Sequence, residues 1–201
     1  MRLFVALDID AEIRQRIAQF GNQMRHLAPD VRWVAPETFH ITLQFLGETQ
    51  KLGEIQRALR QVKGSPIDLV FRNAGFFPAP KSPRVFWVGI ESDQNLQKLV
   101  KSIAQVLQPL GFERDKGPFK PHLTLARAGS GRPRAMPGER SVPSLQHVRA
   151  KVETMPLPEL GTMTAREFCL YDSKLSPTGA QYSKLSRYSL EGAPRFESGT
   201  A

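Results

Sequence analysis

Two short segments of the chain carry the side chains best suited to acid–base chemistry. Residues 40–43 read His-Ile-Thr-Leu and residues 122–125 read His-Leu-Thr-Leu, and together they hold two of the four histidines. In each segment apolar residues alternate with His and Thr, which is the period-two pattern of a β-strand with one buried face. Each imidazole and hydroxyl should therefore share a face, and two such strands can present both pairs to one small ligand.

Two histidines and two threonines suit an in-line displacement at phosphorus. This reaction needs a base for the attacking oxygen and an acid for the leaving oxygen, and an imidazole can serve as either near neutral pH. The hydroxyls of Thr42 and Thr124 can bind the non-bridging oxygens of the phosphate. A zinc site on His40 and His122 would need a third ligand that the sequence does not show. We therefore predict no metal and no cofactor.

A single histidine on a strand is more often structural than catalytic. The repetition argues for function, because both copies have the same neighbours and each follows a segment that contains proline, 36–39 and 118–121. The remaining two histidines, His26 and His147, lie in helical patterns without a motif. We expect both at the surface.

The charge of the chain favours a polyanionic partner. The formal net charge is +9 and the calculated pI is about 10.1. Between Arg114 and Lys151 nine basic residues face two acidic ones, so +7 of the net +9 surrounds the second motif. A generic basic surface is the alternative, but a phosphate-bearing partner fits better.

Composition narrows the class of protein. The hydrophobic fraction is 40%, and the sequence has no apolar run long enough to span a membrane. We therefore expect no membrane partner. The apolar stretch at the N-terminus is too short for a signal peptide and is expected to be a strand. Cys169 is the only cysteine and is expected to pack in a strand. A cytoplasmic location is therefore predicted. We expect a monomer, although the sequence gives no signal for the oligomeric state.

Strands and helices are expected to alternate along the chain. Helices are predicted from a cap at Asp10 to Leu27, from Leu52 to near Gly64, from a cap at Asp93 to Leu110, and from Leu145 to Met155. Strands are predicted at 3–9, 31–34, 39–46 (ending at Gly47), 67–77, 84–90, 121–126, 165–171 and 181–190, with an irregular loop over 129–143 and a turn over 173–179.

This order predicts an α+β fold. We expect two pseudo-symmetric lobes of mostly antiparallel sheet with outer helices, and an active-site groove between them. No linker separates the halves, so residues 1–190 are predicted to form a single bilobal domain. Residues 191–201 are predicted to be a disordered tail.

Residues 40–48 (HITLQFLGE) and 121–127 (PHLTLAR) resemble the paired H-x-T signatures of the two-histidine phosphoesterases. The branch that they resemble most is the RNA 2′,3′-cyclic phosphodiesterase, or 2′-5′ RNA ligase, family, and the resemblance spans nearly the whole chain. It implies metal-independent opening of RNA or nucleoside 2′,3′-cyclic phosphates to 2′-phosphates, with 2′-5′ ligation as a possible reverse reaction. It further implies that His40 donates a proton, that His122 accepts one, and that Thr42, Thr124 and Arg127 bind phosphate.

Two residues that the resemblance points to conflict with strict alternation. Phe45 and Arg127 would point away from the His/Thr face unless their strands bulge or end first. We expect Phe45 to pack in the core. Arg127 is expected to be functional, because an unpaired buried guanidinium would be costly. Asp8 and Asp10 are expected to serve capping or turn roles.

Two rival functions remain open from the sequence. The same chemistry could act on another substrate, such as a cyclic ADP-ribose phosphate or a 2′-5′ oligoadenylate. Alternatively, the chain could be a basic RNA-binding module without turnover. Intact His and Thr in both motifs argue against the second, because binding alone does not need two proton carriers.

Overall fold

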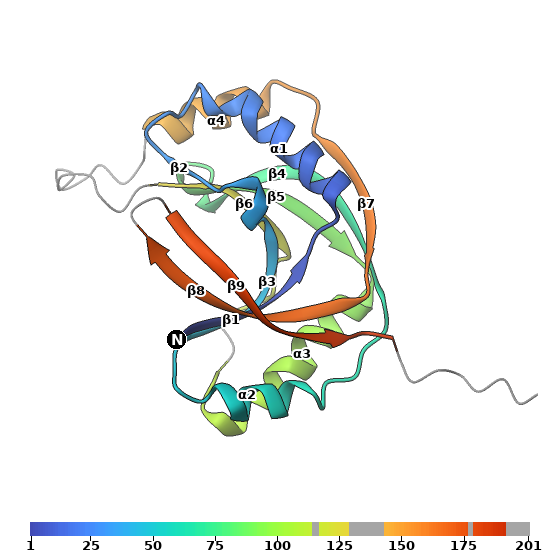
Figure 1. Cartoon of the computed structure of the whole chain (residues 1–201). Coiled ribbons are helices and arrows are strands. Elements are labelled where there is room, and N and C mark those ends of the chain that lie inside the picture. Colours follow the sequence, from blue (N-terminus) through green and yellow to red (C-terminus); the bar gives the residue numbers. More distant parts are fainter. Residues whose placement is uncertain (114–116, 129–142, 177–178, 192–201) are drawn as a thin grey trace, which may run out of the picture.

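The computed structural model describes residues 1–113, 117–128, 143–176 and 179–191. Residues 129–142 of the predicted loop (129–143), residues 192–201 of the predicted tail (191–201) and part of the basic segment lie outside these residues. The helices are α1 (Ala11–Arg25), α2 (Leu52–Leu59), α3 (Gln94–Leu107) and α4 (Pro143–Glu153), with short 3₁₀ turns η1 (Pro36–Thr38) and η2 (Gln108–Leu110) (Figure 1). The strands are β1 (Arg2–Asp8), β2 (Arg32–Trp33), β3 (His40–Glu48), β4 (Ile67–Ala79), β5 (Ser82–Ser92), β6 (His122–Arg127), β7 (Glu159–Ala165), β8 (Glu167–Ser176) and β9 (Gly179–Ser189).

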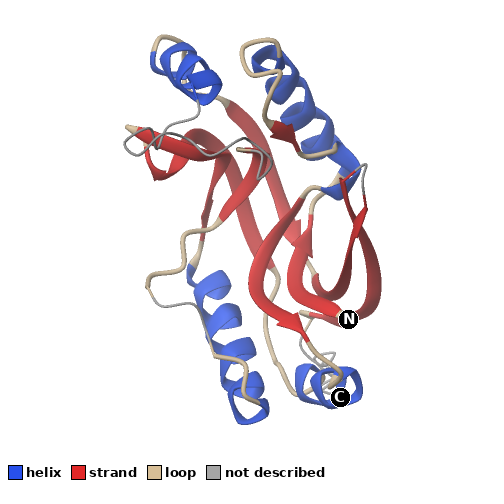
Figure 2. Cartoon of the chain, turned by 90° about the vertical axis from the view of Figure 1, so that its left-hand side faces the viewer, coloured by secondary structure: helices blue, strands red, loops and turns tan. Residues whose placement is uncertain are grey.

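The strands form two antiparallel sheets, and each contains one motif strand. The first sheet has the order β3-β1-β8-β9 and the second has the order β2-β6-β5-β4-β7. The sheets curl, and the helices lie on their outer sides (Figure 2). The predicted α+β class with mostly antiparallel sheet and outer helices is confirmed.

The two halves exchange helices. The helix α1 follows β1 of the first sheet but contacts β7 of the second, whereas α3 follows β5 of the second sheet and contacts β3 of the first. One continuous set of buried side chains accordingly includes Val5 and Leu7 from the first sheet and Phe71 and Phe86 from the second. This shared core fixes the two motif strands relative to each other.

The helix signals in the sequence are confirmed most clearly at α3. The Asp93 carboxylate accepts a hydrogen bond from the Asn95 backbone at 2.9 Å, and Gly111 follows the helix with a φ of +89°. The residues of its apolar stripe are buried: Leu96, Leu99, Val100, Ile103 and Leu107. Among the described residues, no helix is long and apolar enough to cross a bilayer.

Several predicted boundaries are wrong. The helix α2 ends at Leu59, before Gly64, and β3 continues through Gly47 to Glu48. Gly47 has a φ of +71° at a register shift, where glycine permits a bulge that keeps the strand paired. Both late strands extend into the predicted turn, β8 to Ser176 and β9 from Gly179.

Strand β7 was not predicted. It pairs with β4, and a register shift there leaves Leu160 unpaired between Glu159 and Gly161. The extra residue breaks the alternation of buried and exposed side chains on which a strand prediction depends.

Candidate active site

The two motif histidines open the two motif strands. His40 is the first residue of β3 and His122 is the first residue of β6. Cα atoms of these strands come within 8 Å of one another, although the histidines are 82 positions apart in the sequence. Both side chains, like those of Thr42 and Thr124, are partly exposed, so neither ring is sealed in the core.

The two rings are anchored in the same way. His40 Nδ1 lies 2.7 Å from the Thr38 carbonyl, and His122 Nδ1 lies 2.8 Å from the Lys120 carbonyl. A carbonyl can only accept, so each Nδ1 carries a hydrogen and donates it. The other ring nitrogen, Nε2, is thereby left as the group that can take up or release a proton.

Both imidazoles have a pKa below the ordinary histidine value. Burial is the largest cause that lowers the pKa of each ring, and the backbone hydrogen bond opposes it in both. The Arg127 guanidinium lowers the pKa of both His40 and His122, so one cation acts on both rings. The Asp8 carboxylate raises the pKa of His40, and Arg14 lowers it.

Both motif strands bulge at the same place. The shift between β1 and β3 leaves Leu43 without a partner, and the shift between β5 and β6 leaves Leu125 without one. Each skipped residue lies three positions after the motif histidine. Such a one-residue shift moves the following side chains to the opposite face, so the fifth residue after each histidine joins the His/Thr face.

The bulges place Phe45 and Arg127 on the face that carries the motif histidines and threonines, which we call the site face. Arg127 Nη2 donates to Thr124 Oγ1 at 3.3 Å, and the Arg127 side chain is exposed rather than buried as expected. The expectation that Phe45 packs in the core is wrong, because it is 56% exposed. Its ring centroid lies 6.2 Å from that of Phe4, which in turn lies 4.8 Å from that of His40.

Aromatic side chains that the sequence did not point to flank both histidines. Tyr182 meets the His40 ring edge-on at 5.1 Å between centroids. Phe77 meets the His122 ring edge-on at 4.9 Å, and Trp87 lies 6.3 Å from it. A Cβ at Gly75 would lie 2.4 Å from the Trp87 indole, so glycine leaves the space that this indole occupies.

The predicted capping or turn role of Asp8 is wrong. Asp8 is the last residue of β1, and its carboxylate accepts hydrogen bonds from the Tyr171 hydroxyl and the Lys184 ammonium. Burial raises the pKa of the Asp8 carboxyl, but these two hydrogen bonds and the positive charges of Lys184 and Arg14 together outweigh it, so the pKa lies below the usual value. Asp10 does occupy the N-cap position of α1, although its side chain makes no capping hydrogen bond.

Arg32 is a second guanidinium that the sequence did not single out. It pairs directly with Arg127 across β2 and β6, so both side chains leave the sheet on the same side. Its neighbour Trp33 points to the opposite side, where its ring centroid lies 6.2 Å from that of Phe86 in the core. Arg32 is exposed.

The remaining residues considered in the sequence are His26, His147 and Cys169. His26 and His147 are exposed, as predicted, and Cys169 is buried. Within the described ranges, one group of three His, Cys, Asp or Glu ligand atoms lies within 4.8 Å of one another, and it consists of Asp8, Glu167 and Cys169. Burial raises the pKa of the Cys169 thiol to about 12, so this group does not supply the thiolate that a metal would prefer.

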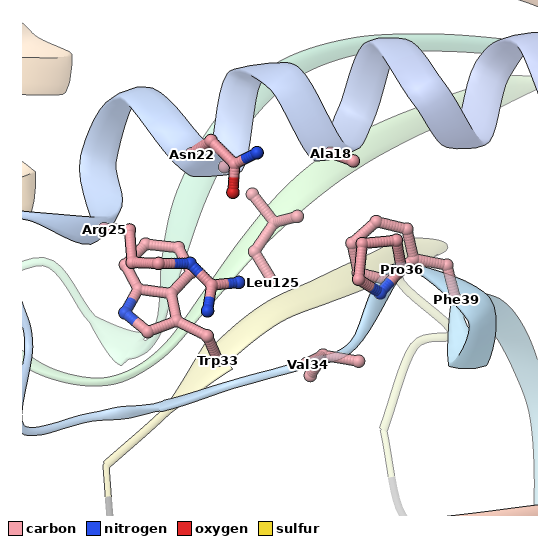
Figure 3. Close-up of a pocket in the computed structure, with 9 residues that line it drawn as sticks. Ala18, Asn22, Arg25, Trp33, Val34, Pro36, Phe39 and Leu125 are labelled. Carbon is pink, nitrogen blue, oxygen red and sulfur yellow. The ribbon is translucent and has the colours of Figure 1, made fainter.

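A small cavity lies on the core side of β6. Leu125, Trp33 and Phe39 line it together with residues of α1, and neither histidine does (Figure 3). The guanidinium carbon of Arg25 lies 5.5 Å from the centre of the Trp33 ring. The other face of β6 carries His122, Thr124 and Arg127.

Comparison with known proteins places the chain in a family. A family model described as the 2′-5′ RNA ligase superfamily matches residues 9–172. An RNA 2′,3′-cyclic phosphodiesterase of Archaeoglobus fulgidus is 37% identical over 187 residues, which cover 92% of this chain and 98% of the relative. Another, of Thermotoga maritima, is 32% identical over 196 residues, which cover 96% and 97%.

Solved structures agree with this result. E. coli LigT complexed with 3′-AMP has a TM-score of 0.73 and 28% identity, covering 95% of this chain and 98% of that one. LigT complexed with phosphate has a TM-score of 0.69 and 26% identity over the same shares. Since the family model spans most of the sequence and the relatives align over nearly their whole length, the chain belongs to the 2′-5′ RNA ligase superfamily.

Proposed function

We propose that this protein hydrolyses RNA 2′,3′-cyclic phosphates to 2′-phosphomonoesters without a metal. The observation that carries the proposal is the pair of imidazoles, anchored alike through Nδ1 on two strands of different sheets that approach within 8 Å between Cα atoms, with Arg127 acting on both. Relatives named RNA 2′,3′-cyclic phosphodiesterase support the substrate class.

His122 is the proposed base. Burial lowers its pKa, as it lowers that of His40, but among the described residues no carboxylate acts on His122 to favour its protonated form. Its Nε2 is therefore the better acceptor for the proton of a water molecule. The water oxygen attacks phosphorus on the side opposite the leaving oxygen, and the bond between phosphorus and the ribose O3′ breaks. The 2′-oxygen keeps the phosphate.

His40 is the proposed acid. Its Nε2–H gives a proton to the departing O3′, so the ribose leaves as a neutral hydroxyl rather than as an alkoxide. The Asp8 carboxylate favours the protonated ring that this step requires. The proton taken up by His122 and the proton lost by His40 balance over one turnover.

Thr42, Thr124 and Arg127 are proposed to bind the phosphate. The Arg127 guanidinium donates to Thr124 Oγ1, which orients both donors toward the same place. Charge-assisted hydrogen bonds from a guanidinium stabilise the negative charge that shifts among the non-bridging oxygens during attack. This stabilisation needs no metal.

RNA ends are the favoured substrates within this class. Arg32 lies directly opposite Arg127 on the site face, and two adjacent guanidinium groups repel one another unless an anion lies between or beside them. An RNA end supplies a second phosphate next to the cyclic one, whereas a nucleoside cyclic phosphate does not.

The direct test is incubation of the purified protein with an RNA that ends in a 2′,3′-cyclic phosphate, in excess EDTA. We expect conversion to the 2′-phosphate, distinguished from the 3′-phosphate by phosphorus NMR. Unchanged substrate, or activity lost on chelation and restored by a divalent cation, would overturn the proposal. A non-catalytic RNA-binding module would bind the RNA and leave it unchanged.

The description of the family model also favours 2′-5′ RNA ligation at the same site. If the 5′-hydroxyl of a second RNA takes the place of water, the same base and acid produce a 2′-5′ phosphodiester. Adding an RNA with a free 5′-hydroxyl to the assay should then yield a longer product that resists 3′-5′-specific nucleases. A product of unchanged length would restrict the protein to hydrolysis.

A further inference from the structure

The two histidines have matching anchors but different neighbours across the strand. His40 on β3 pairs directly with Asp8 on β1, whereas His122 on β6 pairs directly with Gly89 on β5. Directly paired residues of an antiparallel ladder project from the same side of the sheet with Cβ atoms about 4.5–5.5 Å apart. One imidazole therefore has a carboxylate beside it and the other has no side chain there.

The glycine beside His122 is required by the backbone. A Cβ at Gly89 would come within 2.7 Å of the Arg72 carbonyl oxygen, which is part of the rigid β4 ladder. The second sheet therefore excludes an acidic side chain at the position that Asp8 fills in the first. The surroundings of His40 and His122 therefore differ because of the residue on each partner strand, Asp8 on β1 and Gly89 on β5.

The carboxylate beside His40 is held by two further strands. Asp8 accepts from Tyr171 on β8 and from Lys184 on β9, and the side chains of Asp8 and Lys184 are 34% and 25% exposed. Tyr171 also stacks on Phe4 at 5.1 Å between centroids, and Phe4 contacts His40. The network thus spans the first sheet and ends at the motif histidine.

We propose that Asp8 is a positioning residue that determines which of the two histidines carries the proton, keeping it on His40. The proposal rests on the acid and base roles given above and adds the cause of their assignment. A nearby carboxylate stabilises an imidazolium more than an imidazole. Lys184 moderates this effect, so that His40 can still release its proton to the leaving oxygen.

Other charged and titratable groups around His40 do not supply this effect. Arg14 of α1 and Arg127 of β6 both act against a positive charge on the ring. Tyr171 is neutral, because burial and the hydrogen bond to Asp8 raise its pKa far above neutrality, and burial also raises the pKa of Tyr182. Among the groups of the described residues that act on His40, Asp8 is the one that carries a negative charge.

The negative charge of Asp8 opposes the binding of an anionic substrate, so a purely structural role does not explain why it is there. The site face carries Arg127 and Arg32 and is proposed to bind an anion, which the Asp8 carboxylate repels. A neutral partner for Tyr171 would hold the sheet together without that repulsion. The carboxylate is therefore better explained by its effect on His40.

The test compares Asp8→Asn with Lys184→Met. In Asp8→Asn the alkaline limb of the kcat/KM profile should move to lower pH, with a loss of about threefold or more on that limb. In Lys184→Met no ammonium offsets the negative charge of the Asp8 carboxylate, so the same limb should move to higher pH. A network that only supports the fold would shift neither limb, or would reduce activity equally at every pH in both variants.

Histidine titration by NMR gives a readout that does not need turnover. The His40 ring should titrate at lower pH in Asp8→Asn and at higher pH in Lys184→Met, while the His122 ring stays unchanged. Asp10→Asn is the matched control, because Asp10 is exposed and two residues away, and neither ring should move. Equal shifts of both rings, or an unchanged His40 in a folded Asp8→Asn or Lys184→Met protein, would overturn the proposal. Inactivity of the wild type with the expected His40 shifts would instead refute only the proposed reaction.

Discussion

Phe45 and Arg127 occupy equivalent positions on the two motif strands, each five residues after a motif histidine and each turned to the site face by a bulge. The skipped residues, Leu43 and Leu125, are equivalent too. One strand thereby adds an exposed aromatic ring to its imidazole and hydroxyl, and the other adds a guanidinium. The pseudo-symmetric halves thus place different groups beside their histidines.

Replacing either motif histidine should remove most of the activity without unfolding the protein. His40→Ala and His122→Ala should each reduce kcat by about 10²–10⁴-fold, because each loses one proton transfer. His26→Ala is the control, since His26 is exposed and outside the site. Single-turnover rates and thermal melts check this, and a near-normal rate in either variant would remove that histidine from its role.

The pH profile should be bell-shaped and displaced to the acid side. The acid must be protonated and the base neutral, and the pKa of both rings lies below the ordinary value because of burial. The kcat/KM profile reports the free enzyme, so its maximum should fall below about pH 6.5. Bound phosphate stabilises both imidazolium forms and should shift the kcat profile to higher pH. A maximum of kcat/KM above pH 8 would contradict the burial of both rings.

Replacing Arg127 should impair turnover, whereas replacing Arg32 should impair the binding of RNA. Arg127→Ala should weaken turnover of every cyclic phosphate, because its guanidinium is proposed to bind the reacting group. Arg32→Ala should weaken binding of RNA ends and reduce the slope of log affinity against log salt by about one, with nucleoside cyclic phosphates unaffected. Arg60→Ala, an exposed arginine on the helix side of the first sheet, is the control. An unchanged salt slope in Arg32→Ala would mean that Arg32 does not contact RNA.

Phe45 should be dispensable for stability. Because it is 56% exposed, Phe45→Ala should change the free energy of unfolding by less than about 0.5 kcal/mol. Leu43→Ala on the same strand, where the side chain is 5% exposed, should cost about 2–5 kcal/mol. Urea unfolding measures both, and a large loss in Phe45→Ala would place this ring in the core after all.

Gly75 should not accept a side chain. The added Cβ of Gly75→Ala would lie 2.4 Å from the Trp87 indole and force it from its place beside His122, at a cost of about 1–3 kcal/mol. Gly53→Ala in α2 is the control, since its Cβ would meet only the end of Arg57 at 3.8 Å. It should stabilise the helix by about 0.5–1 kcal/mol. Tryptophan fluorescence and urea unfolding of both variants check this, and an unchanged spectrum in Gly75→Ala would contradict the packing.

Local patterns in the sequence were sufficient to predict most of the helices and strands. Period-two alternation identified both motif strands and the shared face of each imidazole and threonine, and the apolar stripe with its cap at Asp93 identified α3. These signals depend on residues within a few positions of one another, so they can be recognised in the sequence without the structure. The repetition of the motif added a long-range expectation, that the two strands lie close together, and their Cα separation agrees with it.

Only the tertiary structure showed how further residues come to lie beside the histidines. A bulge depends on the register of the partner strand, so nothing near Phe45 or Arg127 reveals that each turns to the site face. Asp8 receives its hydrogen bonds from residues 163 and 176 positions away, and Arg32 meets Arg127 only through the pairing of β2 with β6. Such relationships arise from the packing of whole sheets, which no short stretch of sequence encodes.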